Sequence, residues 1–169
     1  MQTIRTNLWF DTEAEEAAHF YTSVFKDSKL GEVQRYPAVG QEIHGKPAGS
    51  VLTVEFFLNG QPYIALNGGP EFKFNEAISL EIVCDDQAEL DYYWEKLSEG
   101  GDREAQQCGW LKDKFGVSWQ IAPAALGEML SDPNQQKRER VFEAMLQMKK
   151  LDVNALRAAF EGQPAASRR

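Results

Sequence analysis

The sequence predicts an α+β fold made of two copies of a strand, helix, three-strand module, followed by a helical C-terminal extension. Apolar and polar residues alternate in two strand-like segments, and each segment precedes an amphipathic helix. The same order of elements starts again after roughly 75 residues, which indicates an internal duplication. We divide the chain into a first module at 1–70, a second module at 71–123, a helical extension at 124–162 and a disordered tail at 163–169.

The first predicted strand covers 4–10 and has one apolar and one polar face. The apolar face carries Ile4, Leu8 and Phe10, and the opposite face carries Arg5, Asn7 and Trp9. A capping box of Thr12 and Glu15 then predicts the start of a helix that runs to about Lys26. A possible strand at 32–36 leads into a loop rich in glycine and proline.

The first module ends in a predicted hairpin. Its two strands, 51–58 and 63–67, are rich in β-branched and aromatic residues. Asn59-Gly60 between them tolerates positive φ and favours a tight turn. We therefore expect the two strands to pair antiparallel.

The second module repeats the pattern. Strand 78–83 is followed by a helix that Asp86 and Glu89 cap and that Gly100-Gly101 ends. Three short strands are predicted next, at 104–108, 109–113 and 117–122. The extension is expected to form helices at 124–130, 136–150 and 153–160, the last capped by Asp152. In the second of these helices, the residues expected to point inward are Val141, Phe142, Met145, Leu146 and Met148.

Composition excludes several classes of function. Twenty-six acidic against eighteen basic residues give a net charge of -8, which disfavours binding to nucleic acid or to an anionic membrane. No apolar run reaches the length of about eighteen residues that a membrane-spanning helix needs. Two cysteines and the absence of a signal peptide indicate a reducing compartment, and we expect a cytoplasmic protein.

Three motifs carry a resemblance to a known family. They are Leu8-Trp9-Phe10-Asp11 with Phe20-Tyr21, the strand end at 65–70, and the run from Cys108 to Ile121. With the segment 144–152, they resemble the PhnB-like branch of the vicinal oxygen chelate superfamily, which is often labelled demethylubiquinone methyltransferase. The superfamily includes glyoxalase I, extradiol dioxygenases and bleomycin resistance proteins. The resemblance implies two modules that form cupped mixed sheets, and a homodimer.

The resemblance also implies where a metal would bind. Enzymes of the superfamily hold a divalent ion with four side chains on the first and last strands of the modules, which fall here on Arg5, Ala65, Ser79 and Gln120. None of these is a suitable donor, so no metal is expected. His19 and His44 are interpreted as ordinary surface residues.

No other cofactor is expected. Most S-adenosylmethionine enzymes carry a glycine-rich turn after the first strand of a parallel sheet, and no G-x-G sequence occurs in this chain. Methyl transfer is therefore disfavoured despite the label.

The polar faces of the strands are predicted to line a concave ligand-binding surface. Its candidate residues are Arg5, Asn7, Trp9, Tyr63, Asn67, Ser79, Glu81, Trp110 and Gln120. Arg5 can hold a carboxylate or phosphate, with Glu81 as orienting group or general base, or the two can simply pair with each other. Cys108 is a weaker candidate nucleophile because no histidine lies at a position to activate it. Trp119 is assigned to the core, and Asp113 with Gly116 to a turn.

Two functions remain open. The first is a homodimeric protein that binds a small organic ligand without a metal. The second is a metal-independent enzyme for a small acidic or aromatic substrate, with Glu81 as base and Arg5 as anchor. The exposed arm at Phe72 and Phe74, together with the amphipathic tail, offers apolar surface for dimer contacts.

Overall fold

The computed structural model describes residues 4–163, in two compact units that divide after Phe74. The first unit contains β1, α1, β2, α2, β3 and β4, and the second contains β5, α3, a short 3-10 helix, β6, β7 and α4 to α6. Both units combine a sheet with helices, which confirms the α+β class. The second unit includes the C-terminal helices that we assigned to an extension.

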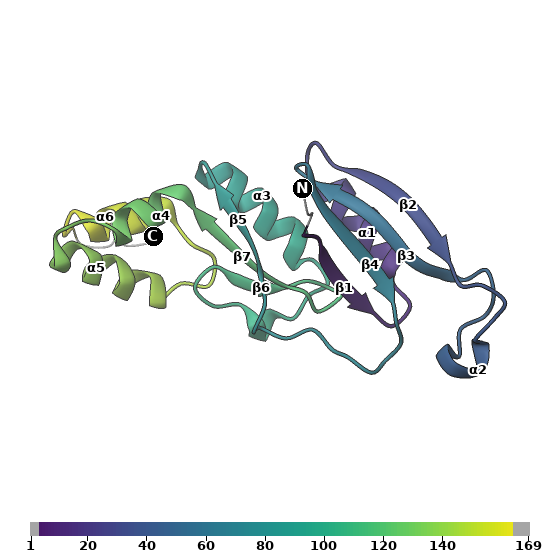
Figure 1. Cartoon of the computed structure of the whole chain (residues 1–169). Helices are drawn as coiled ribbons and strands as arrows, with labels where there is room; N and C mark the ends of the chain where they lie inside the picture. Colours follow the sequence, from purple (N-terminus) through teal and green to yellow (C-terminus); the bar gives the residue numbers. More distant parts are fainter. Residues whose placement is uncertain (1–3, 164–169) are drawn as a thin grey trace. The chain divides into compact units, whose positions relative to one another are not determined.

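The first unit is a four-stranded mixed sheet with a helix on one face (Figure 1). Its strand order is β1-β4-β3-β2, where β1 pairs parallel with β4 and the other two pairs are antiparallel. The bounds are β1 Thr6–Phe10, α1 Ala14–Val24, β2 Lys29–Arg35, α2 Gln41–His44, β3 Val51–Leu58 and β4 Gln61–Asn67. β1 is shorter than predicted: Ile4 precedes it and is 95% exposed.

The hairpin between β3 and β4 forms as predicted. Asn59 and Gly60 have φ values of 47° and 80°, and Leu58 pairs with Gln61 across the turn. Two successive positive φ values give the twist that joins antiparallel strands through two residues. The register of the whole β3–β4 pair follows from this turn.

The second unit has a three-stranded sheet of order β5-β7-β6, covered on one face by α3. Its elements are β5 Leu80–Cys84, α3 Gln87–Ser98, β6 Trp110–Lys112 and β7 Ser118–Pro123. The predicted capping of α3 is confirmed: Asp86 accepts from the Glu89 amide at 2.9 Å, and Glu89 accepts from the Asp85 amide at 2.8 Å.

The predicted strand at 104–108 is wrong. Residues Arg103–Ala105 form the 3-10 helix, whose N-cap Asp102 accepts from the Glu104 amide at 2.9 Å. After this helix, Gln107 forms an isolated bridge with Trp110 in place of the predicted strand. The hydrogen bond from the Glu104 amide to the Asp102 side chain stabilises a local turn, which competes with the hydrogen bonds of a strand. The second module therefore has one strand fewer than the first.

The turn before β7 is built around a buried carboxylate. Asp113 is 2% exposed and accepts from the amides of Phe115 and Val117, at 2.9 and 3.0 Å. Its other oxygen accepts from the Trp119 indole at 2.8 Å, and Trp119 is 2% exposed. Gly116 has a φ of 87°. The predicted core position of Trp119 and the predicted turn are both confirmed.

The extension forms α4 Ala124–Leu130, α5 Gln135–Leu146 and α6 Val153–Phe160. The bounds of α4 and the Asp152 cap of α6 are as predicted, and Asp152 accepts from the Ala155 amide at 2.9 Å. α5 ends earlier than expected, and the inward placement of Phe142 and Leu146 is wrong because they are 50% and 44% exposed. The tail predicted to be disordered, apart from Gln163, lies outside the described residues.

Main-chain hydrogen bonds join the extension to the rest of the second unit. The amides of Cys108 and Gly109 donate to the carbonyls of Met148 and Lys149, each at 2.8 Å. Both donors have positive φ, 51° and 87°, and this directs two successive N–H groups to one side. Gln87 on α3 adds bonds to the Leu151 carbonyl and the Val153 amide. The segment 147–153 is thus an integral part of this unit.

Within residues 4–163, no helix combines the length and hydrophobicity needed to span a lipid bilayer.

Candidate functional site

The sheet of the first unit has a buried face against α1 and an opposite face that we call the open face. Leu8, Phe10, Val54, Phe56 and Ala65 fill the buried face and are at most 7% exposed. Residues paired across strands point to the same side of a sheet. The register therefore assigns to the open face the residues Arg5, Asn7, Trp9, Thr53, Glu55, Ile64 and Leu66.

The face predicted for β4 is wrong. Tyr63, Ala65 and Asn67 were expected beside Asn7, but they pair with Thr6, Leu8 and Phe10 and lie on the α1 side. Ala65 is fully buried, and Tyr63 stacks on Phe56 at a centroid distance of 5.2 Å. Burial also raises the pKa of the Tyr63 hydroxyl.

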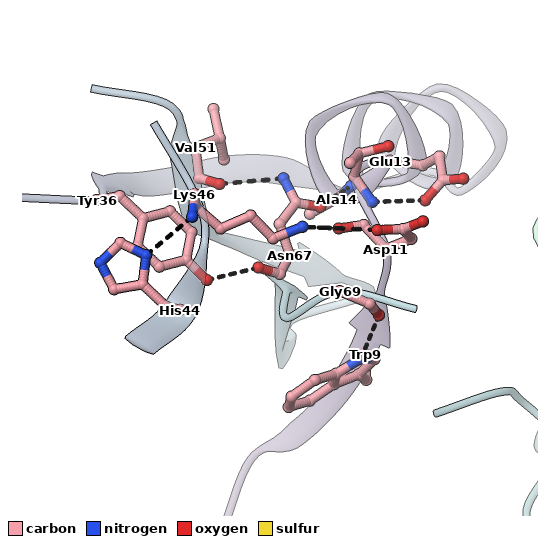
Figure 2. Close-up of polar contacts among 11 residues, drawn as sticks. Trp9, Asp11, Glu13, Ala14, Tyr36, His44, Lys46, Val51, Asn67 and Gly69 are labelled. Atoms are coloured by element: carbon pink, nitrogen blue, oxygen red, sulfur yellow. Dashed lines mark hydrogen bonds and ion pairs between the residues drawn. The ribbon is translucent and has the colours of Figure 1, made fainter. Parts of the chain in front are cut away.

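Asn67 has a structural role at the start of α1 (Figure 2). Its side chain accepts from the Ala14 amide at 2.8 Å and donates to the Val51 carbonyl at 3.1 Å. Its carbonyl accepts from the Tyr36 hydroxyl at 2.7 Å. The capping box predicted at Thr12 does not form, because this amide from a distant strand supplies the acceptor.

The loop between β2 and β3 is tied to the same region. Lys46 contacts Asp11, with its amine 3.1 Å from the carbonyl and 3.5 Å from the carboxylate. The His44 ring lies 4.6 Å from the Tyr36 ring and accepts from the Lys46 amide at 3.1 Å (Figure 2). His44 is therefore packed and hydrogen-bonded, whereas His19 is exposed as predicted.

The open face carries a groove of about 240 Å³, which we call the Arg5–Glu55 groove. Asn7, Ile64 and Glu55 lie in one row across β1, β4 and β3, with Ile64 between the two polar residues. The volume lies slightly below the range of about 300–1,000 Å³ typical of pockets for drug-sized ligands. The lining residues are Arg5, Asn7, Glu32, Gln34, Thr53, Glu55 and Ile64.

An ion pair spans the groove. The Arg5 guanidinium donates to Glu55 at 2.9 Å, with exposed side-chain fractions of 47% and 27%. Gly31 on β2 makes room for this carboxylate, because a Cβ there would lie 2.6 Å from Glu55 Oε2. β2 is bulged between Leu30 and Val33, the segment that contains Gly31. The bulge and the glycine together position Glu55.

The remaining polar groups lie toward β2. Thr53 donates to the Gln34 side chain at 3.3 Å. Glu32 is exposed, and no hydrogen bond or ion pair engages its carboxylate among residues 4–163. Sequence reasoning missed five lining residues, Glu32, Gln34, Thr53, Glu55 and Ile64. The available signal was the alternation along β3, where Thr53 and Glu55 interrupt the apolar series Val54, Phe56 and Leu58.

Trp9 lies on the open face as predicted but outside the groove lining. Its indole donates to the Gly69 carbonyl at 2.9 Å (Figure 2). Its ring meets the Phe72 ring edge-on, at a centroid distance of 4.9 Å. A Cβ at Gly68 would lie 2.1 Å from the Trp9 ring. The absence of a side chain at Gly68 therefore provides the space that the Trp9 ring occupies.

The other candidates belong to the second unit. On its sheet Glu81 pairs with Gln120, and Gln120 pairs with Trp110, so these three share the face predicted for them. Gln120 donates to the Ser79 hydroxyl at 2.8 Å. Glu81 is exposed, and among the described residues nothing fixes its carboxylate. Arg5, in the first unit, pairs with Glu55.

The two cysteines have different surroundings. Cys84 is fully buried, and burial followed by the charges of Glu89 and two aspartates raises its thiol pKa to about 12. Cys108 is half-buried, and its sulfur lies 3.3 Å from Nε2 of the Gln107 side chain. Its positive φ serves the turn that binds the extension. No histidine is among its hydrogen-bond partners.

The four positions implied for a metal do not fit a divalent ion. Arg5 is cationic and paired, Ala65 is buried under α1, and Gln120 donates to Ser79. The β4 residues on the open face, Ile64 and Leu66, also lack donor atoms. In the described part of the chain, no three His, Cys, Asp or Glu side chains cluster in a way that could hold a metal.

Module order and sheet topology define an α+β protein of the vicinal oxygen chelate class. Residues 2–122 match the family model described as 3-demethylubiquinone-9 3-methyltransferase. The chain belongs to this family, in its PhnB-like branch. The match ends before α4, so the resemblance of segment 144–152 lies beyond it.

One solved structure supports this assignment, and others are similar to the chain. A PhnB protein from Bacillus cereus, named as a 3-demethylubiquinone-9 3-methyltransferase, is 34% identical with a TM-score of 0.63, covering 73% of this chain and all of its own. A protein from Pseudomonas aeruginosa, 18% identical with a TM-score of 0.56, has the same fold over 73% of this chain and 98% of its own. A Staphylococcus aureus protein is 28% identical, with a TM-score of 0.31 and coverage of 73% and 98%. Among curated proteins, none matches the chain.

Proposed function

We propose that this PhnB-like protein binds a small organic molecule in the Arg5–Glu55 groove, without a metal ion. The observation that carries the proposal is the groove itself: a hollow of about 240 Å³ where an apolar floor at Ile64 is surrounded by charged and amide groups. An apolar surface with a few convergent polar groups is the usual composition of a small-molecule site. The poor fit of the four implied metal positions supports binding by side chains alone.

Binding is favoured over catalysis because neither group that the enzymatic alternative uses is held ready for a reaction. That alternative used Glu81 as base and Arg5 as anchor, but Arg5 is engaged by Glu55. Glu81 lies in the other unit, where it is exposed. A general base needs to be held within hydrogen-bond reach of its substrate. Among the described residues, no contact holds the Glu81 carboxylate in a fixed position.

Methyl transfer is not part of the proposal, although the family name refers to it. S-adenosylmethionine enzymes mostly bind the cofactor at a glycine-rich turn that follows the first strand of a parallel sheet. Here β1 leads into Asp11, Thr12 and Glu13, and the sheet it joins is mixed. The residues present do not fit that cofactor.

The proposal is tested with the full chain after dialysis against a chelator. A library of small polar metabolites is screened by thermal shift, and hits are titrated by calorimetry. A true ligand at a hundred times its Kd should stabilise the protein by about 2.7 kcal/mol. Asn7→Leu and Thr53→Val should weaken it, whereas Thr12→Val, an exposed threonine outside the groove, should not. Binding that requires added metal, or that ignores both groove variants, contradicts the proposal.

We also propose that the protein is a cytoplasmic homodimer. Phe72, Phe142 and Leu146 are 64%, 50% and 44% exposed, which leaves apolar surface available for subunit contact. Both cysteines are free, in agreement with a reducing compartment. Sedimentation equilibrium of the full chain distinguishes a dimer from a monomer.

A further inference from the structure

We propose that the ligand of the Arg5–Glu55 groove is a small organic cation with N–H donors, such as a primary amine or a guanidine. This inference rests on the proposed function and names its ligand class. It reverses the expectation from sequence, in which Arg5 anchors a carboxylate or phosphate.

The first argument is the charge that remains in the groove. Its lining contains one cation, Arg5, and two carboxylates, Glu32 and Glu55. The ion pair at 2.9 Å neutralises Arg5 with Glu55. The carboxylate of Glu32 has no partner in the described part of the chain. A cation entering the groove therefore meets an available negative group, in a protein whose net charge is already -8.

The second argument is the cost for an anion. To reach the Arg5 guanidinium, an anion must displace Glu55, which would then face the ligand as a like charge. Glu55 has little freedom to withdraw toward β2, because it already lies against the backbone at Gly31. The structure thus places an internal carboxylate where an acidic ligand would bind. Arg5 serves to hold Glu55 in position.

The third argument separates classes of cation. Quaternary ammonium groups have no N–H donors and are bound in cages of aromatic rings. Of the described residues that line this groove, none is aromatic. Its lining instead offers oxygen acceptors from Asn7, Gln34 and Thr53 beside the two carboxylates. Ammonium and guanidinium groups use such acceptors, which favours a primary amine or a guanidine.

Three probes of similar size test the inference on the full chain: agmatine, choline and glutarate. Binding is followed by amide chemical shifts in NMR, with Asn7, Thr53 and Ile64 as reporters of the groove. We expect agmatine to bind there, choline at least about fivefold more weakly, and glutarate not at all. Agmatine binding should weaken as salt is raised, because the groove is partly exposed.

Variants then identify the groups responsible. Glu32→Gln should weaken agmatine binding about fivefold, as expected for an exposed charge pair. Arg5→Met should strengthen it a few-fold, because it frees Glu55 for the ligand. Glu95→Gln, on the exposed side of α3, changes the net charge equally and should have no effect. Far-UV circular dichroism and the thermal midpoint confirm that each variant folds.

The outcomes separate this inference from the proposed function. Glutarate binding that is lost in Arg5→Met would overturn the cation inference and leave a groove that binds ligands. Equal binding of choline and agmatine would overturn the requirement for N–H donors. If neither these probes nor any library compound shifts the groove reporters, the proposed function fails as well.

Discussion

Replacing Asn67 by alanine is expected to destabilise the first unit by about 3 kcal/mol, although this buried residue does not line the groove. Asn67 is 7% exposed and joins three elements: it receives the first amide of α1, donates to β3 and terminates β4. Its loss removes two hydrogen bonds and leaves their partners inside the protein.

The magnitude follows from the two bonds. Loss of a helix cap costs about 1 kcal/mol, and this cap is buried, so the Ala14 amide cannot turn to water instead. An unsatisfied buried donor or acceptor costs about 1–3 kcal/mol, and the Val51 carbonyl also loses its donor. A total of about 3 kcal/mol is a conservative sum of the two.

Urea unfolding followed by circular dichroism measures the loss, and hydrogen exchange locates it. The Ala14 amide should exchange faster in Asn67→Ala than in the unmodified protein. The matched control is Asn134→Ala, which removes an exposed cap that accepts from the Lys137 amide at 3.2 Å and should cost about 1 kcal/mol or less. If both variants lose equal stability, burial of the Asn67 cap has no added effect and the reasoning is refuted.

Three further predictions concern the second unit. Asp113→Ala should cost about 3 kcal/mol in urea unfolding, because the Trp119 indole and two amides lose their acceptor; a loss under 1 kcal/mol would contradict this. Cys108 should react with a thiol reagent in the native state, whereas Cys84 should react only on unfolding. Because the folded-state pKa of Cys84 is raised from 9.0 to about 12, its contribution to stability is complete below pH 9 and is lost as pH rises toward 12. Cys84→Ala should therefore show a shallower alkaline loss of stability than the unmodified protein.

Much of the fold could be predicted because local signals and tertiary packing agree. Asn59-Gly60 specifies a hairpin turn by backbone preference alone, and Asp86 and Asp152 start helices with their own side chains. These features need no information from distant parts of the chain. α1 differs because its cap comes from Asn67, fifty-three residues away in sequence.

The face of β4 could not be read from its sequence. Tyr63, Ile64, Ala65, Leu66 and Asn67 give apolar or amphipathic side chains in both alternating sets, so either set can face a core. A shift of one residue exchanges the two faces completely. The decision comes from tertiary packing, in which Ala65 and Asn67 are buried on the side of α1, at 0% and 7% exposed. This single ambiguity moved Asn67 into the predicted site.

The candidate site was only partly predictable for a related reason. Arg5 and Asn7 follow from alternation along β1, but their neighbours in the groove come from β3 and β2, which sequence does not place beside them. The partner of Arg5 depends on strand order β1-β4-β3-β2, in which Glu55 is two strands away.

The bonds from Cys108 and Gly109 to Met148 and Lys149 bear on how such a chain can be shortened. The family match stops at residue 122, yet the donors of these bonds lie within it and the acceptors lie beyond it. A chain cut after β7 would leave two adjacent left-handed N–H groups pointing at water, and would expose the Leu151 contact over Gly109. The turn before β6 thus depends on the segment that follows α5, so a truncation that spares every groove residue should still destabilise this turn.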